Sequence, residues 1–254
     1  MDWTDEGIVI GTRRHGESSA ILEAMTRLRG RHLGLVRGGR SSRLSPVLQP
    51  GNGVRLHWRA RLDEHLGNFT VEATVFRAGR LMETSASLHG LAYLCALLRL
   101  LPEREPDEGL HAAACVLLDH LGDASLAAAM TVRFEIALLG KLGFGLDLSA
   151  CAATGATQEL CYVSPRSGRA VSARAGAPYA DRLLTLPAFA RSDFIGETVT
   201  PAEVAAGFAL TGHFLARQVF EPRGLTLPDE RAAFLAAALG EARQGGAPAA
   251  PSGA

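Results

Sequence analysis

The spacing of apolar residues changes once along this 254-residue chain, near residue 80, and that change limits the folds open to it. Between residues 54 and 61 apolar and polar side chains alternate, as in a strand with one buried face. The apolar face carries Val54, Leu56, Trp58 and Ala60. The opposite face carries Arg55, His57, Arg59 and Arg61.

Other segments of the first 80 residues are also short, apolar-rich and separated by Gly or polar turns, which is typical of strands. They cover residues 7–13, 18–26, 31–38 and 69–75. Five short strands in such a short stretch predict a small closed barrel, and the five-stranded option is the OB-fold.

Beyond residue 84 apolar residues recur every three or four positions, which predicts helices. The predicted helices cover residues 87–101, 108–121, 125–142, 200–220 and 229–243. The fourth begins at Thr200-Pro201-Ala202-Glu203, a capping box with Pro at the first helical position. The fold class is therefore α+β, a five-stranded OB-fold barrel followed by an all-α domain.

Residues 145–186 interrupt the helical pattern with Gly, Pro, Ser and Thr. We expect an irregular insert there, with a hairpin between 161–163 and 170–172. The predicted domains are 1–80 and 81–243, the second containing the insert, and residues 244–254 form a disordered tail.

Charge is distributed unevenly although the formal net charge is zero, with 26 basic and 26 acidic residues. Residues 1–80 hold 13 Arg and 8 acids, whereas residues 81–254 hold 13 basic residues and 18 acids. The apolar content of 47% excludes a disordered acidic or basic protein. Opposite charge in the two halves favours contact with nucleic acid or a membrane.

The stretch 24–62 is the most basic part of the chain and contains no acidic residue. Its nine arginines are Arg27, Arg29, Arg31, Arg37, Arg40, Arg43, Arg55, Arg59 and Arg61. A solvated basic face is the ordinary explanation of a short charge run. Here the run covers several strands without a compensating carboxylate, so a bound polyanion is the better explanation. All nine arginines are therefore candidate DNA contacts. Trp58 is assigned to the core in preference to a base-stacking role.

Motifs for bond chemistry are absent from the sequence. There is no Walker A loop, no GxGxxG, no GxSxG elbow and no HExxH. We therefore expect no enzyme. We also expect no signal peptide, no membrane span and a cytoplasmic location. Cys95 and Cys115 are interpreted as small buried residues on helices.

Several longer motifs resemble the bacterial RecO recombination mediators. They are residues 25–40 (MTRLRGRHLGLVRGGR), 48–51 (LQPG) and 133–145 (RFEIALLGKLGFG), with 164–168 (SPRSG) where that family carries its finger. The resemblance extends from about residue 5 to 240, with the motifs in the family's order.

The resemblance implies an OB domain, a helical domain and a small finger, which is the insert at residues 145–186. It implies binding of ssDNA and dsDNA, annealing of complementary strands, and loading of RecA with RecR onto DNA coated by single-strand-binding protein. No catalysis and no membrane are implied, and the expected location is the cytoplasm, at the nucleoid. Arg31, Arg37, Arg40 and Arg43 fall where the family has basic residues on the barrel.

Many family members hold the finger with two Cys-x-x-Cys pairs, and this sequence departs from that pattern. The first pair here is Cys151-Ala152-Ala153-Thr154 and the second region is Ser172-Ala173-Arg174-Ala175, so Cys151 alone remains of four ligands. A structural zinc site needs four ligands. We expect no zinc and no other cofactor, with the insert held by packing of Tyr162, Val163, Val171 and Tyr179.

The acidic helical half is the expected surface for protein partners, including the C-terminal tail of single-strand-binding protein. Arg133 and Lys141 are candidate contacts for that tail, although ordinary surface charge explains them equally well. Two other functions remain open: an RNA-binding or translation-linked OB module, and a scaffold whose basic face binds an acidic protein.

Overall fold

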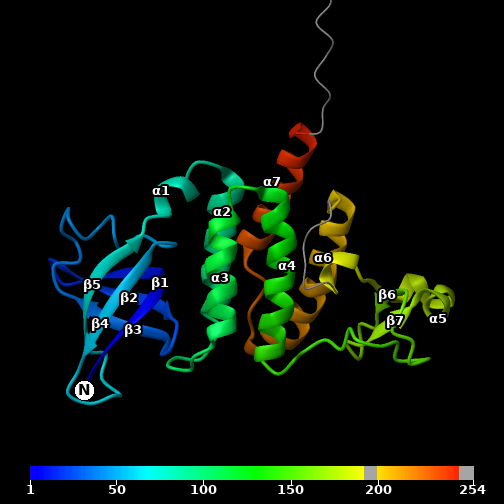
Figure 1. Cartoon of the computed structure of the whole chain (residues 1–254), viewed down its shortest axis with the longest axis horizontal. Coiled ribbons are helices and arrows are strands. Elements are labelled where there is room, and N and C mark those ends of the chain that lie inside the picture. Colours follow the sequence, from blue (N-terminus) through cyan, green and yellow to red (C-terminus); the bar gives the residue numbers. More distant parts are fainter. Residues whose placement is uncertain (192–198, 246–254) are drawn as a thin grey trace, which may run out of the picture. The chain divides into compact units, whose positions relative to one another are not determined.

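A computed structural model describes residues 1–191 and 199–245 of the chain (Figure 1). The chain divides into two compact units, Met1–Gly122 and Asp123–Ala254. The first unit thus contains the barrel together with the helices that follow it, up to residue 122. The predicted domain limits at residues 80 and 243 are not tested by this division and stay predictions.

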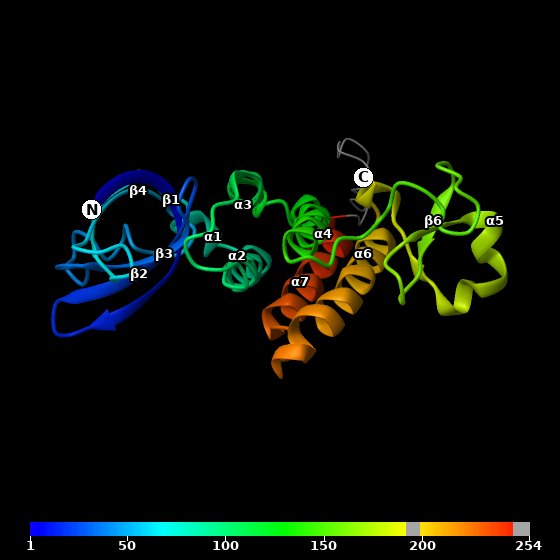
Figure 2. The same cartoon turned by 90° about the horizontal axis from the view of Figure 1, so that it is seen from below.

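Five strands close into the predicted barrel, with the order β1-β2-β3-β5-β4. They are β1 (Asp2–His15), β2 (Ser19–Thr26), β3 (Gly30–Val36), β4 (Gly53–Arg59) and β5 (Asn68–Val75). Figure 2 shows these strands curving round a common axis. The predicted OB-fold and the α+β class are confirmed.

Strand β1 is twice as long as the predicted segment 7–13, because it serves two neighbours. Its first half, from Asp2 to Ile8, pairs with β4, and its second half, to His15, pairs with β2. The register shifts between Val9 and Gly11, where a bulge bends the strand from one partner to the other.

The alternation in β4 matches its burial: Val54, Leu56 and Trp58 are buried, and the residues between them are exposed. Trp58 is 1% exposed, its Nε1 donates to the Leu66 carbonyl at 3.0 Å, and its ring stacks on Trp3. The assignment of Trp58 to the core is confirmed, and this side chain is not a base-stacking platform.

The remainder of the first unit is helical. It contains α1 (Ala78–Leu81), α2 (Ser85–Leu98) and α3 (Glu108–His120). Thr84 and Asp107 cap α2 and α3, each accepting a hydrogen bond from a backbone N–H of the first turn. The short helix α1 was not predicted from the sequence.

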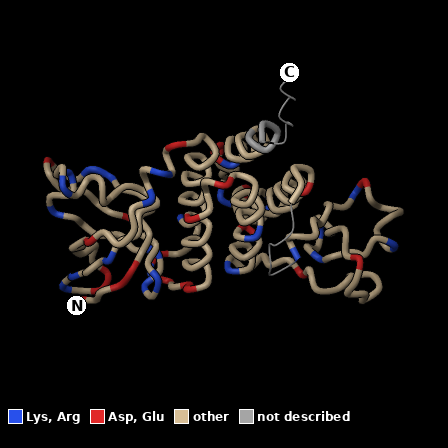
Figure 3. Tube along the Cα trace, turned by 45° about the horizontal axis from the view of Figure 1, so that its top comes forward, with Lys and Arg blue, Asp and Glu red and all other residues tan. Residues whose placement is uncertain are grey.

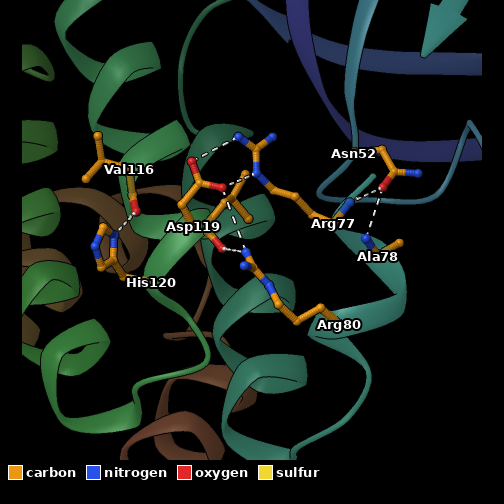
Figure 4. A network of polar contacts seen from close by, with 8 residues as sticks. Asn52, Arg77, Ala78, Arg80, Val116, Asp119 and His120 are labelled. Carbon is orange, nitrogen blue, oxygen red and sulfur yellow. Dashed lines mark hydrogen bonds and ion pairs between the residues drawn. The ribbon is translucent and has the colours of Figure 1, made fainter. Parts of the chain in front are cut away.

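Asn52 fastens the β3–β4 loop (residues 37–52) to the start of α1. It is 1% exposed, and its Nδ2 donates to the carbonyls of Pro46 (2.8 Å) and Val47 (3.2 Å). Its Oδ1 accepts the backbone N–H groups of Arg77 (2.8 Å) and Ala78 (3.0 Å), as Figure 4 shows. The hydrogen-bonding capacity of this buried amide is therefore fully used.

Arg77 continues this network into α3. Its guanidinium, in a side chain only 8% exposed, forms two hydrogen bonds with the Asp119 carboxylate, at 2.7 and 3.2 Å (Figure 4). These bonds lower the pKa of Asp119. The loop, α1 and α3 are thus joined by one continuous set of polar contacts.

The second unit is built on three helices, α4 (Ala124–Lys141), α6 (Pro201–Phe214) and α7 (Asp229–Gly245), which Figures 1 and 2 show side by side. The predicted capping box is present, with Thr200 accepting from the Glu203 N–H and Glu203 from the Thr200 N–H. The helix continues as a wider turn to Phe220. The predicted tail of residues 244–254 is wrong for its first two residues, because α7 continues to Gly245. The rest of the predicted tail lies outside the described residues.

The insert forms the predicted hairpin, β6 (Leu160–Val163) with β7 (Ala170–Ser172), and adds a third strand, β8 (Leu184–Thr185). A short α5 (Ala173–Gly176) follows β7. Of the four residues expected to hold the insert by packing, Val163 is fully buried and Tyr162 and Val171 are partly buried. Tyr179 is 57% exposed, so its predicted packing role is wrong.

A buried ion pair lies among α4, α6 and α7. Glu135 is fully buried and accepts Arg231 Nε at 2.8 Å and Nη2 at 3.1 Å. Thr211 donates to the same carboxylate, and Arg231 also donates to the Phe208 carbonyl at 2.8 Å. The helices of the second unit are therefore linked by polar contacts in their interior.

We expect Glu135→Gln to destabilise the protein by about 3–5 kcal/mol, because the change breaks the buried ion pair between Glu135 and Arg231 by removing one of its two charges. Denaturant unfolding followed by circular dichroism measures the change. Replacing both Glu135 and Arg231 with Met is the control and should recover most of the loss, because neither charge is then buried. If Glu135→Gln lowers the free energy of unfolding by no more than ~0.5 kcal/mol, as a substitution at an ordinary surface position does, this interpretation is contradicted.

Candidate nucleic-acid interface

The nine predicted arginines do not form one surface. Arg27 and Arg29 lie in the β2–β3 turn, and Arg31 is the second residue of β3, opposite Met25. Arg37, Arg40 and Arg43 follow the other end of β3, where Val36 lies opposite Ala20. Figure 3 shows basic positions in blue on several separate loops and turns of the barrel.

Three arginines of the run are paired with acids from other parts of the chain. Arg27 Nε lies 2.8 Å from Glu108, and Arg55 Nη2 lies 3.2 Å from Glu6. Arg31 contacts Glu23 at 2.7 Å, donates to the Leu101 carbonyl, and has a side chain only 16% exposed. The expectation that the run has no compensating carboxylate is therefore wrong for Arg27, Arg31 and Arg55.

Other arginines of the run keep their charge exposed. Among the described residues, Arg37, Arg43, Arg59 and Arg61 are exposed and form no ion pair. Arg29 lies over the Trp3 ring at 5.9 Å. Arg59 and its strand neighbour His57 face Asn68 and Thr70 across the β4–β5 ladder, whereas Arg55 faces Glu72. On its other side β4 pairs with β1, which places Asp2 opposite Arg59 and Thr4 opposite His57. Asp2 and Arg59 form no ion pair among the described residues, so the Arg59 guanidinium is adjacent to an acid but not bound to it.

The first hollow, as we name it, is a cavity of about 690 Å³ bounded by the β3–β4 loop and the strands β4 and β5. Its basic lining residues are Arg37, Arg43, His57 and Arg59, and none of the described residues that line it carries a carboxylate. Ser41, Asn68 and Thr70 add neutral polar groups. Guanidinium groups with hydroxyl and amide neighbours are the donors that phosphate backbones bind.

Sequence reasoning missed a second group of basic residues. Arg13 and Arg14 lie near the C-terminal end of strand β1, are exposed, and pair in register with Ile21 and Ala20. Together with Arg40 they line another cavity, of about 390 Å³, the second hollow. The sequence does show two consecutive arginines here. Because Glu17 and Glu23 lie close to them, however, they fall outside the stretch 24–62, which is defined by containing no acidic residue.

The predicted partner contacts of the helical half both lie on α4. Arg133 is partly buried and Lys141 is exposed at the C-terminal end of the helix. A partner role for these two residues stays a prediction.

The residues of the insert do not fit a zinc site. No group of three or more His, Cys, Asp or Glu residues in the described ranges is placed to hold a metal ion. Cys151 Sγ instead accepts the Ser172 N–H at 3.3 Å, and Cys161 Sγ donates to the Glu159 carbonyl. Thr154 also contributes a hydrogen bond to Cys151. Residues at the positions of other ligands, Thr154 and Ser172, are thus hydrogen-bonding to the remaining cysteine.

These hydrogen bonds change the acidity of Cys151. Donation from Ser172, and then from Thr154, lowers the pKa of the Cys151 thiol to about 6. Cys95 on α2 is 5% exposed, as predicted, and burial raises its pKa to about 12. Cys115 is partly buried, less than predicted.

The lowered pKa makes the stability of the protein depend on pH. Because the folded thiol titrates near 6 and the unfolded thiol near 9, its contribution is complete above pH 9 and is lost as pH falls through 6. We expect the difference in melting temperature between the natural chain and Cys151→Ala to grow from pH 6 to pH 9. Cys161→Ala is the control, and a pH-independent difference for Cys151→Ala contradicts the assignment.

No helix among the described residues is both long enough and apolar enough to span a bilayer. The closed five-stranded barrel, followed by helices with a small sheet-containing insert, defines the chain as an OB-fold protein with a helical C-terminal part.

Comparison with known proteins narrows this class to one family. The protein-family model described as Recombination protein O N terminal matches residues 1–76. The family model described as Recombination protein O C terminal matches residues 82–226. The chain is 58% identical over 245 residues to the DNA repair protein RecO of Methylobacterium nodulans, covering 95% of this chain and 100% of that protein. It is 58% identical to that of Mesorhizobium japonicum over 93% of both chains. The chain belongs to the RecO family.

Proposed function

We propose that this chain is a DNA repair and recombination mediator that binds ssDNA and dsDNA through its barrel and anneals complementary strands. With RecR, it assists RecA loading on DNA coated by single-strand-binding protein. The observation that carries the proposal is the first hollow, whose three arginines form no ion pair with any described residue, in a member of the RecO family. The work is done by binding, and no bond is made or broken.

The physical basis is neutralisation of phosphate charge. Two strands that approach each other repel through their backbones, and arginines bound to one backbone reduce that repulsion. Base pairing then proceeds by the chemistry of the bases. Such binding reads no base edges, so it tolerates any sequence and weakens steeply as salt rises.

The charge available for this task is not spread evenly over the nine arginines. Arg37, Arg43 and Arg59 line the first hollow, and we assign them the principal contacts. Arg27 and Arg55 are exposed but already lie beside carboxylates, so their pairing with phosphate would first require an ion pair to break.

We expect the double variant Arg43→Ala/Arg59→Ala to lower the salt slope of ssDNA binding by about 1.4, that is about 0.7 for each phosphate that an arginine no longer neutralises. Fluorescence anisotropy of a labelled oligonucleotide over a salt series measures the slope. The matched control Arg27→Ala/Arg55→Ala removes the same number of exposed arginines and should change the slope clearly less. Equal changes in both variants would show that net charge, not the first hollow, determines binding.

For the helical half we propose protein partners. The C-terminal tail of single-strand-binding protein is acidic, and Arg133 and Lys141 on α4 supply positive charge for it. A cytoplasmic, nucleoid-associated location accords with this set of partners.

We further propose that the insert folds without zinc. The support is that Thr154 and Ser172 hydrogen-bond to Cys151 and that Asp147 and Ala152 join the chain to the β7 segment through backbone bonds. Elemental analysis after dialysis against a chelator should find no stoichiometric metal, and the melting temperature should not change. Retention of about one zinc per chain would overturn the proposal.

A further inference from the structure

The β3–β4 loop borders two basic cavities, and different residues of the loop line each of them. Arg37, Ser41 and Arg43 line the first hollow, whereas Arg40, Ser45 and Gln49 line the second. No residue lines both. The strands that complete them also differ: β4 and β5 for the first hollow, β1 and the start of β2 for the second. The two cavities are therefore separate sites divided by one loop.

The second hollow is a formed feature, because the loop is fastened to the β1–β2 turn beside it. The Arg40 N–H donates to the Ser18 carbonyl at 3.0 Å, and its guanidinium donates to the Glu17 carbonyl at 2.6 Å. Gly39 lets the loop approach β2 closely, since an added Cβ would lie 2.9 Å from the Ala20 Cβ. These contacts hold the wall of the cavity in place.

The chemistry of the second hollow suits a phosphate backbone. Arg13, Arg14 and Arg40 line it, together with the neutral polar groups of Thr12, Ser45 and Gln49, and in the part of the chain that the structure describes no carboxylate lines it. Glu23, opposite Gly11 on the neighbouring strand, is already occupied by Arg31 and Arg99, at 2.7 and 2.8 Å. Among the described residues, neither Arg13 nor Arg14 forms an ion pair.

We propose that the second hollow binds the backbone of a second DNA strand while the first hollow holds the first strand. The inference rests on the proposed function and adds to it a site for the other strand. One barrel then holds two backbones on either side of the β3–β4 loop, and annealing takes place between strands bound to the same chain. We assign the more tightly bound strand to the first hollow, which is the larger of the two.

The test uses two oligothymidylate strands, one with a donor dye and one with an acceptor dye, which cannot pair with each other. Energy transfer between them reports two strands on the protein, and anisotropy of a trace of one strand reports the tighter site. The full-length chain and two double variants are compared, Arg13→Ala/Arg14→Ala and Arg43→Ala/Arg59→Ala, each lacking two exposed arginines. Annealing of complementary strands is measured in parallel.

For Arg13→Ala/Arg14→Ala we expect the binding of the second strand, measured by energy transfer, to depend less on salt, with a slope smaller by about 1.4. We also expect annealing to slow, and the affinity for the trace strand to change less. For Arg43→Ala/Arg59→Ala we expect trace-strand binding itself to weaken. The inference is overturned if Arg13→Ala/Arg14→Ala shows the same energy transfer and the same annealing rate as the natural chain. It is also overturned if both variants lose trace-strand binding equally, because that result indicates one continuous site. If the natural chain binds no DNA, the proposed function fails instead.

Discussion

The amide of Asn52 is the contact on which the rest of the barrel surface depends. The β3–β4 loop contains turns but no strand or helix, so its shape is not set by a ladder of its own. Asn52 joins the loop carbonyls of Pro46 and Val47 to the first N–H groups of α1. Because the loop borders both hollows, a buried side chain without charge fixes where the arginines of the interface lie.

Pairing, more than number, decides which arginines are available to an anion. Arg31 and Arg99 share the Glu23 carboxylate, and Arg77 is bound to Asp119, so these cations hold helices to the barrel. An arginine in such a contact would have to exchange a carboxylate for a phosphate, with little net gain. The arginines that line the two hollows form no ion pair among the described residues, so no carboxylate has to be displaced when a phosphate binds them.

Sequence alone predicted the elements whose apolar period is regular. The strands, the long helices, the capping box at Thr200 and the burial of Trp58 all follow from local pattern. The ion pairs could not be predicted from local pattern, because Arg27 and Glu108 are 81 residues apart and Arg55 and Glu6 are 49 apart. Short elements such as α1 and β8 have too few residues to show a period. Arg13 and Arg14 become part of a site only because the barrel brings the distant β3–β4 loop beside them.

The order of strands explains why two hollows exist at all. β5 lies between β3 and β4 in the closed barrel, so the chain leaving β3 cannot turn directly into β4 and must cross the barrel end. The crossing segment returns at Gly51, whose N–H donates to the Val9 carbonyl of β1, after contacting the β1–β2 turn through Arg40. A connection that touches both sides of the barrel end necessarily divides the surface there. Arginines on its two sides therefore face different strands, and a single loop provides a wall to each of two basic cavities.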